Sequence, residues 1–237
     1  AVLKNPLADP GIIGISSGAG FAAVCITAFA PTLYFFTPVA ACFGGIAAFV
    51  IVYALSWKGG LSPLRIILTG MSSVVNSMSG GDRTGVASIV EGNITQKTWD
   101  DAATLFPYVV VGLVLSVLFI GRCNLLALED KTARSLGVNV NRTRIIISVI
   151  AVILASISTA VVGAISFLGL IVPHIGRILV GSDHKRLVPF SVFAGAFTFL
   201  LADTIGRTIC RPYEVSAAVV MSVIGGPFFI LLLRGKR

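Results

Sequence analysis

The sequence predicts an all-α fold, a polytopic transmembrane helical bundle with about eight spans, and three observations lead to this prediction. Of the 237 residues, 56% are hydrophobic and only 12% are charged, whereas soluble domains are about 25% charged. The mean hydropathy is +0.96. Apolar runs long enough to cross a bilayer recur along the chain, and short polar linkers separate them. These observations exclude a soluble enzyme, a disordered chain and a disulfide-rich secreted protein.

Eight apolar runs are expected to cross the membrane. A transmembrane helix needs roughly 20 apolar residues, and about 17 suffice at the short end of the range. The runs cover residues 11–30, 38–57, 64–80, 104–121, 145–163, 165–181, 188–206 and 215–233. The third and sixth runs are short and interrupted by Gly, Ser or Pro, which is typical of broken segments that pack inside protein or line a cavity. Residues 1–237 are thus predicted to form a single transmembrane domain.

The Lys and Arg residues divide unequally between the two sides that eight crossings define. Fourteen of the 18 fall on one side, and the other side holds only Arg83, Lys97, Arg207 and Arg211. Because cytoplasmic loops carry the excess of Lys and Arg, the first side and both ends of this chain are predicted to face the cytoplasm. The basic residues of these cytoplasmic loops also account for the net charge of +8, so no nucleic-acid partner is expected. The chain is expected to contact the lipid bilayer.

One cytoplasmic loop, residues 122–144, is long enough to hold structure of its own. Its segment Leu125–Val138 is predicted to form a short helix, with Asp130 as the N-cap and Gly137 in the left-handed conformation that ends it. The helix would carry Leu128, Thr132 and Leu136 on one face. Such a helix can dock into a groove on a soluble partner, and an amphipathic helix lying on the membrane surface explains the pattern equally well.

Polar and small residues within the spans suggest two further roles. Asp203 and Arg207 lie four residues apart, so they share a helix face, and Arg207 either presents its charge to an external partner or only anchors the helix. Small residues crowd the first and third runs and are interpreted first as helix-packing sites. In the third run, however, Asn76 favours a polar path, together with Ser73 and Ser77.

Sequence signatures of catalysis and metal binding are missing. No phosphate-binding loop of the form GxxxxGK[ST] occurs, and no His, Glu or Cys cluster has metal-ligand spacing. The four cysteines lie far apart and are interpreted as small buried hydrophobic residues. We therefore expect no catalytic residue, no metal and no cofactor in this chain, which is not predicted to be an enzyme.

Several motifs resemble one family. The opening segment Asn5–Ala19 is similar to the NPLADPxxLGxSxGA signature of FecCD-type ABC-importer permeases, which carry iron-siderophores, haem or cobalamin. Leu125–Val138 resembles their LLALGxxxAxxLGV loop, and Phe167–Arg177 resembles FxGLxxPHxxR. Ile224–Phe229 resembles the IGxPxF ending. The matches follow the family's order along the whole chain.

This resemblance implies a type II ABC-importer permease of ten spans, here without its first two helices. It implies import of a metal chelate, a ferric siderophore or haem in the first place, by alternating access in a prokaryotic cytoplasmic (inner) membrane. ATP and Mg would belong to a separate ATPase dimer, and the other implied partners are a second permease subunit in a homodimer and an extracytoplasmic substrate-binding protein. A cobalamin importer permease stays open as an alternative. An ATP-independent secondary transporter or channel is a further alternative, although no span carries a chain of Asp, Glu or His for ion coupling.

The resemblance also assigns site residues. The ATPase-coupling residues are Leu128, Glu129, Asp130, Thr132, Ala133, Arg134, Leu136 and Gly137. The inner gate is assigned to Ser62, Pro63, Leu64 and Arg65, and the pathway to Ser73, Asn76 and Ser77. The first, third, sixth and eighth runs would surround this pathway. Docking of the binding protein is assigned to Arg83, Arg207 and Arg211.

Overall fold

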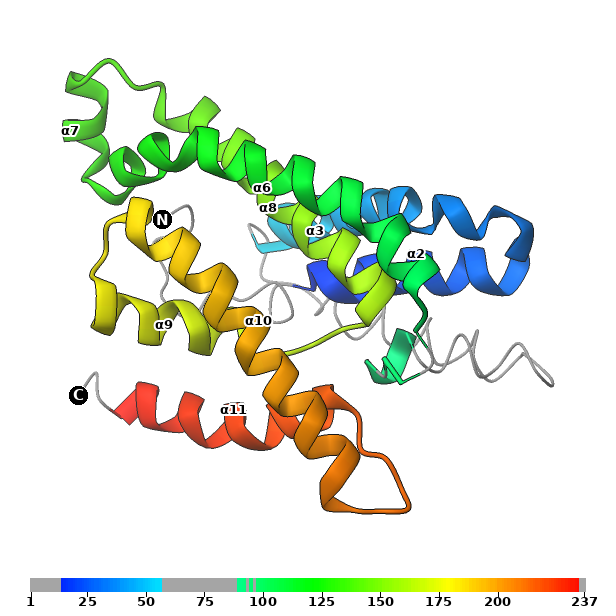
Figure 1. Cartoon of the computed structure of the whole chain (residues 1–237). Coiled ribbons are helices and arrows are strands. Elements are labelled where there is room, and N and C mark those ends of the chain that lie inside the picture. Colours follow the sequence, from blue (N-terminus) through cyan, green and yellow to red (C-terminus); the bar gives the residue numbers. More distant parts are fainter. Residues whose placement is uncertain (1–13, 57–88, 93, 96, 235–237) are drawn as a thin grey trace.

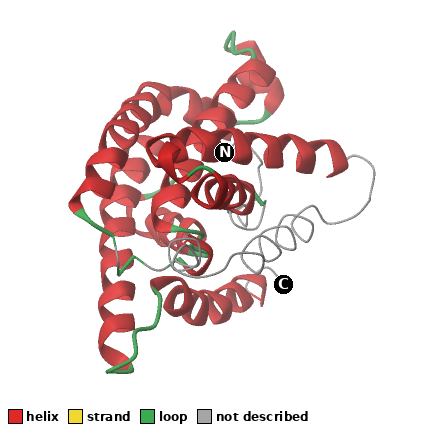
Figure 2. Cartoon of the chain, turned by 90° about the vertical axis from the view of Figure 1, so that its right-hand side faces the viewer, coloured by secondary structure: helices red, strands yellow, loops and turns green. Residues whose placement is uncertain are grey.

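A computed structural model describes residues 14–56, 89–92, 94–95 and 97–234 of the chain. Every regular element in these residues is a helix, and no strand occurs among them (Figures 1 and 2). The elements are α2 (Ile15–Phe29), the 3-10 helix η1 (Pro31–Phe36), α3 (Thr37–Ser56), α6 (Trp99–Ala127), α7 (Asp130–Ser135), α8 (Val140–Val162), α9 (Leu168–Val180), α10 (His184–Ile209) and α11 (Ala217–Arg234). The predicted all-α fold class is therefore confirmed.

Seven of the eight predicted runs coincide with described helices, and the third run, 64–80, lies outside the described residues. Among the described helices, α6, α8 and α10 are each long and apolar enough to cross a membrane, with 29, 23 and 26 residues. The helices α2, α3, α9 and α11 are also apolar, but their apolar segments are only 10–17 residues long. This pattern agrees with a polytopic membrane bundle.

The sixth run is broken, as its composition predicts. Its helix, α9, has 13 residues, which span about 20 Å and so fall short of the roughly 30 Å hydrocarbon core. A non-helical segment precedes it, starting at Gly163 (φ 86°) and ending at Phe167 (φ 67°). A Cβ on Gly163 would collide with the backbone of Gly92 and Ile89, so only glycine fits there. This segment therefore packs closely against residues 89–92.

Small residues bring α2 and α3 into close contact. Gly18 and Ala22 lie four residues apart on α2, and Gly44 and Ala48 have the same spacing on α3. A Cβ on Gly18 would collide with Ala48 and with the carbonyl oxygen of Gly44, and one on Gly44 would collide with Ala22 and the carbonyl oxygen of Gly18. This is the small-xxx-small packing by which membrane helices approach each other. It confirms the packing interpretation for Gly18 of the first run.

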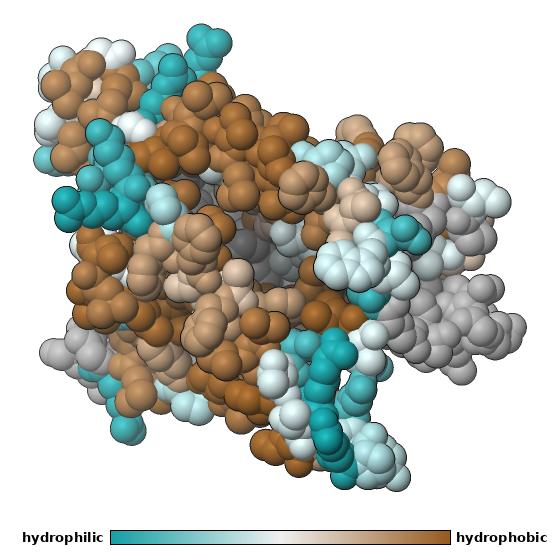
Figure 3. All heavy atoms as spheres, in the orientation of Figure 1, coloured by the Kyte–Doolittle hydropathy of each residue, from teal (hydrophilic) through white to brown (hydrophobic). Residues whose placement is uncertain are grey.

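The charged side chains gather at two opposite ends of the bundle. The basic end consists of the last two turns of α6, α7, the first two turns of α8, the last turn of α9 with the turn that follows it, the first turn of α10, and the last turn of α11 (Figure 1). It holds nine of the twelve described Lys and Arg residues, namely Arg122, Lys131, Arg134, Arg142, Arg144, Arg177, Lys185, Arg186 and Arg234. The opposite end holds Lys97, Arg207 and Arg211. Between the two ends the surface in Figure 3 is mostly hydrophobic, as expected for a bilayer-facing belt.

Candidate functional site

The loop between α6 and α8 carries a short helix, α7, at the basic end of the bundle (Figure 1). Gly137 follows α7 with a φ of 78°, and the backbone N–H of Val138 donates to the carbonyl oxygen of Ala133 at 3.2 Å. The N–H of Gly137 donates to the carbonyl oxygen of Arg134 at 3.0 Å. These two bonds and the left-handed glycine form a Schellman-type ending, as predicted for Gly137.

The helix predicted over Leu125–Val138 is wrong in its extent. Leu125–Ala127 continue α6, because Leu126 is buried against Ala133 and Val140. The chain then turns extended at Leu128 and Glu129, with ψ of 169° and 142°. Glu129, not Asp130, holds the N-cap position, and Leu128 lies before the helix, so Leu128, Thr132 and Leu136 do not form one continuous helix face. In the sequence, Leu125–Leu128 look continuous with α7. The break between α6 and α7 depends on tertiary packing, which a local sequence pattern does not show.

Two contacts fix α7 to the transmembrane helices. Ala133 is 1% exposed and packs with Leu126 of α6 and Val140 of α8, and Ile147 lies against this cluster. Asp130 accepts a hydrogen bond from the guanidinium of Arg144 on α8 at 3.4 Å. A displacement of α7 therefore acts directly on both α6 and α8.

Apolar side chains on the outer surface of this loop have no cover in the described structure. Leu136 is 60% exposed and Leu128 is 41% exposed. Glu129, Thr132 and Arg134 are exposed beside them. Exposed apolar patches with a polar rim mark interaction sites, and these two leucines with their polar neighbours are the candidate residues for such a surface here.

A polar junction at the same end connects α6 to the turn before α10, and sequence reasoning missed it. The side-chain amide of Asn124 donates to Asp183 Oδ1 at 2.6 Å, and its oxygen accepts the backbone N–H of His184 at 2.9 Å. Asp183 also caps α10 by accepting the N–H of Lys185 at 2.9 Å. The Lys185 bond first and the Asn124 bond second hold the pKa of Asp183 below its ordinary value. Two features of the sequence could have indicated this junction. Asn124 lies just after the fourth apolar run, and Asp183 is a typical N-cap residue just before the seventh.

The opposite end holds two of the three residues assigned to docking. Arg207 Nε donates to Asp203 Oδ2 at 2.7 Å, so the predicted pair on one helix face is confirmed. Arg211 is exposed in the loop that follows α10. That loop closes tightly, because the N–H of Val215 donates to the carbonyl oxygen of Gly206 at 3.0 Å and a side chain on Gly206 would collide with Val215. Arg83 lies outside the described residues.

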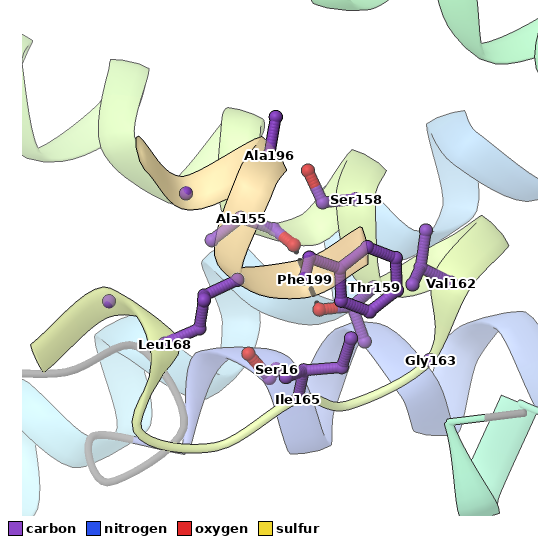
Figure 4. Close-up of a pocket in the computed structure, with 12 residues that line it drawn as sticks. Ser16, Ala155, Ser158, Thr159, Val162, Gly163, Ile165, Leu168, Ala196 and Phe199 are labelled. Carbon is purple, nitrogen blue, oxygen red and sulfur yellow. Dashed lines mark hydrogen bonds between the residues drawn. The ribbon is translucent and has the colours of Figure 1, made fainter. Parts of the chain in front are cut away.

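A cavity of about 370 Å³ lies among α2, α8, α9 and α10 (Figure 4). Its hydroxyl-bearing side chains are Ser16, Ser158 and Thr159. Ser158 donates to the carbonyl oxygen of Leu154 at 2.9 Å, and Thr159 donates to that of Ala155 at 2.8 Å, so both are satisfied within α8. No charged side chain is among the described residues that line it. The cavity can therefore hold a weakly polar or apolar group but offers no ionic anchor.

This cavity lies within one subunit and so does not test the predicted pathway, which the resemblance places between two permease subunits. The fifth and seventh runs, now α8 and α10, contribute to it beside the first and sixth. The assigned pathway residues Ser73, Asn76 and Ser77, and the gate residues Ser62, Pro63, Leu64 and Arg65, lie outside the described residues. Within the described part, no group of three or more His, Cys, Asp or Glu side chains is arranged to hold a metal ion.

Comparisons with known proteins agree with this architecture. The model of the FecCD transport family matches residues 1–235. The "Probable heme-iron transport system permease protein IsdF" of Staphylococcus aureus strain Newman is 39% identical over 241 residues, covering 98% of this chain and 73% of IsdF, and IsdF of strain USA300 gives the same values. A solved structure described as "An inward-facing conformation of a putative metal-chelate type ABC transporter" superposes with a TM-score of 0.76 at 26% identity, covering 99% of this chain and 78% of that one. This chain belongs to the FecCD transport family.

Proposed function

We propose that this chain is the membrane-spanning permease subunit of an ATP-driven importer of a metal chelate, with haem or a ferric siderophore as the cargo. Family membership supports this function, as do the similarities to IsdF, described as a probable haem-iron permease, and to a solved transporter described as putative metal-chelate type. The observation that carries the proposal is α7, a helix with exposed leucines on its outer side and a buried alanine locked to α6 and α8. An ATP-independent transporter would not need a cytoplasmic helix that links an exposed docking surface to two transmembrane helices.

The basic end of the bundle is proposed to face the cytoplasm of a prokaryotic cell, with the permease in its inner membrane. The gathering of nine described basic residues at this end supports the orientation, because Lys and Arg are retained on the cytoplasmic side. Both ends of this chain then lie in the cytoplasm. The ATPase dimer, which binds ATP and Mg, meets the permease at α7.

Alternating access follows from how α7 is attached. When the ATPase subunits close on ATP, they press on the exposed side of α7, and Ala133 passes the displacement to α6 and α8. Asn124 extends it to the turn before α10. Two permease subunits, in a homodimer, then shift between inward-open and outward-open populations, since the ATPase contacts each state differently.

The remaining assigned residues complete the proposal. Arg207 and Arg211, with Arg83, meet carboxylates of the substrate-binding protein at the outer end. Ser73, Asn76 and Ser77 line the path, and the gate at Ser62, Pro63, Leu64 and Arg65 closes it on the inner side. The weakly polar lining of the cavity among α2, α8, α9 and α10 also suits a large chelate that must bind and leave.

Uptake by reconstituted transporter tests the function. The permease with its ATPase subunit and binding protein is placed in proteoliposomes, and ATP-dependent entry of haem, a ferric siderophore and cobalamin is measured. Leu136→Asp is expected to abolish entry and Leu136→Met to retain it. The side chain is exposed in the permease alone, and in this proposal it becomes buried against the ATPase. Entry without ATP, or entry unchanged by Leu136→Asp, would contradict the proposed role of α7 in coupling to the ATPase. Entry of cobalamin alone would move the cargo to that class.

A further inference from the structure

A second cavity, of about 400 Å³, lies at the basic end between α6 and α8, and we name it the α6–α8 pocket. Two arginines line it, Arg122 from α6 and Arg142 from α8. Its other walls include Leu125, Val138, Asn139 and Ile146. None of the described residues that line it is acidic. The pocket thus joins two positive charges to an apolar wall.

The pocket lies at the edge of the hydrocarbon core. Residues 102–121 of α6 form an uncharged stretch of 20 residues, about 30 Å long, which matches the core thickness. Arg122 is the first charge after that stretch, and α8 is uncharged from Ile145 to its last residue, Val162. Arg122 and Arg142 therefore lie at the same level, where phospholipid phosphates lie.

Neither arginine is neutralised within the described part of the chain. Arg144, their neighbour, is paired with Asp130, but neither Arg122 nor Arg142 forms a salt bridge to a described carboxylate. The guanidinium of Arg122 lies over the ring of Phe119, 5.0 Å from its centre. The N–H groups of a guanidinium can form a planar fork of hydrogen bonds to an anion.

Exposed apolar side chains continue from the pocket toward the middle of the bundle. On α6, Leu118 is 71% exposed, and on α8, Ile145 is 64% exposed. These two helices pack against each other. A ligand with a phosphate at one end and acyl chains at the other fits this arrangement. The phosphate would lie in the basic pocket and the acyl chains along the exposed apolar side chains.

We propose that the α6–α8 pocket binds the phosphate headgroup of an anionic phospholipid of the cytoplasmic leaflet, held by Arg122 and Arg142. Basic pockets between transmembrane helices on the cytoplasmic side are suited to such headgroups. The site adjoins Gly137 and Val138, so an occupied pocket supports the loop that ends α7. The assignment of the leaflet rests on the proposed orientation, whereas binding itself is independent of cargo and of ATP.

Native mass spectrometry of the whole permease in detergent tests this site. Phosphatidylglycerol is titrated against phosphatidylcholine with the same acyl chains, and bound adducts are counted. The pair Arg122→Ala and Arg142→Ala is expected to weaken phosphatidylglycerol binding about tenfold or more, since each arginine near a headgroup contributes measurably. The matched control is the pair Lys185→Ala and Arg186→Ala, which removes the same charge from the same end and leaves binding unchanged.

Each alternative has its own result. Equal loss in the control pair would overturn the site, because general charge attraction would then explain binding. Equal affinity for the soluble headgroup, glycerophosphoglycerol, would make it a soluble-anion site instead. Loss of the lipid adduct on adding the ATPase subunit would assign the pocket to an acidic side chain of that protein. Should the alanine pair not fold, Arg122→Lys with Arg142→Lys keeps the charge and removes the fork geometry, and about threefold weaker binding is then expected.

Discussion

The side-chain amide of Asn124 donates a 2.6 Å hydrogen bond to the carboxylate of Asp183, a residue 59 positions further along the chain. The same amide group accepts the backbone N–H of His184 at 2.9 Å. One side chain near the end of α6 thus satisfies both a carboxylate and a helix N-terminus at the start of α10. The junction lies six residues before α7, so it is placed to tie the coupling loop to a second transmembrane helix.

Asn124→Ala and Asp183→Ala are expected to lower the melting temperature of the purified permease, and the double variant is expected to lower it by less than their sum. Residues that share a hydrogen bond are non-additive in this way. Thermal unfolding in detergent measures the four members of the cycle. In proteoliposomes, Asn124→Ala also leaves ATP hydrolysis active while transport per ATP falls. Strict additivity of the two melting shifts would contradict a direct contribution of this bond.

The low pKa of Asp183 predicts a pH-dependent contribution to stability. The N–H of Lys185 and the amide of Asn124 stabilise the carboxylate form, so the native pKa lies below its ordinary value near 3.8. A group with a lowered native pKa stabilises the fold above that ordinary value and loses its contribution as pH falls through the native one. Asp183→Asn keeps the cap and removes the charge, so wild type melts higher at pH 7. The gap in melting temperature is expected to close as the pH is lowered through and below 3.8, whereas a gap that widens would contradict the assignment.

Replacing Gly137 is expected to lower the stability of the fold because of its backbone conformation and not because of a steric clash. Its φ is 78°, yet no heavy atom lies within 4 Å of an added Cβ. Gly137→Ala therefore costs about 1–2 kcal/mol from the left-handed backbone alone. Gly121→Ala is the matched control, because its Cβ also meets nothing but its backbone lies inside α6, and it stabilises by up to about 1 kcal/mol. Chemical unfolding of both variants measures the difference, and equal effects would exclude this explanation.

Close packing of α3 against α8 makes a different prediction for Gly45. A Cβ on Gly45 would collide with the hydroxyl of Ser156, which is fully buried on α8. Gly45→Ala is expected to destabilise by about 1–3 kcal/mol, as overpacked cores do. Adding Ser156→Gly removes the obstructing side chain and is expected to recover part of that loss. Gly195→Ala, where a Cβ meets nothing, serves as the control. A double variant no more stable than Gly45→Ala alone would place the cause elsewhere.

Sequence reasoning found the helices because hydrophobicity alone determines which segments enter a bilayer. The broken sixth run, the charge division and the left-handed Gly137 all follow from local residue chemistry. The Asp203–Arg207 pair does too, since four residues of spacing fix one helix face.

What sequence reasoning missed depends on contacts between distant segments. The α6 helix continues to Ala127 only because Leu126 is covered by Ala133 and Val140, and no local pattern reveals that cover. The junction joins Asn124 of α6 to Asp183, the N-cap of α10, although α7, α8 and α9 lie between them in the chain. The cavity that includes α8 and α10 likewise arises from how helices pack and not from the composition of either one.

Arg207 offers the sharpest separation of a docking role from a structural one. Its ion pair with Asp203 is partly exposed, so Arg207→Ala is expected to cost only about 0.3–0.5 kcal/mol of stability. If Arg207 meets a carboxylate of the binding protein, Arg207→Glu instead weakens association about tenfold or more, because a like charge replaces an attractive one. Arg207→Lys keeps the charge and retains most of the affinity. Association is measured with labelled binding protein and permease in nanodiscs over a range of salt concentrations. The penalty for Arg207→Glu is expected to shrink as salt screens the charges, and a salt-independent penalty accompanied by a lower melting temperature would show that Arg207 serves only the helix.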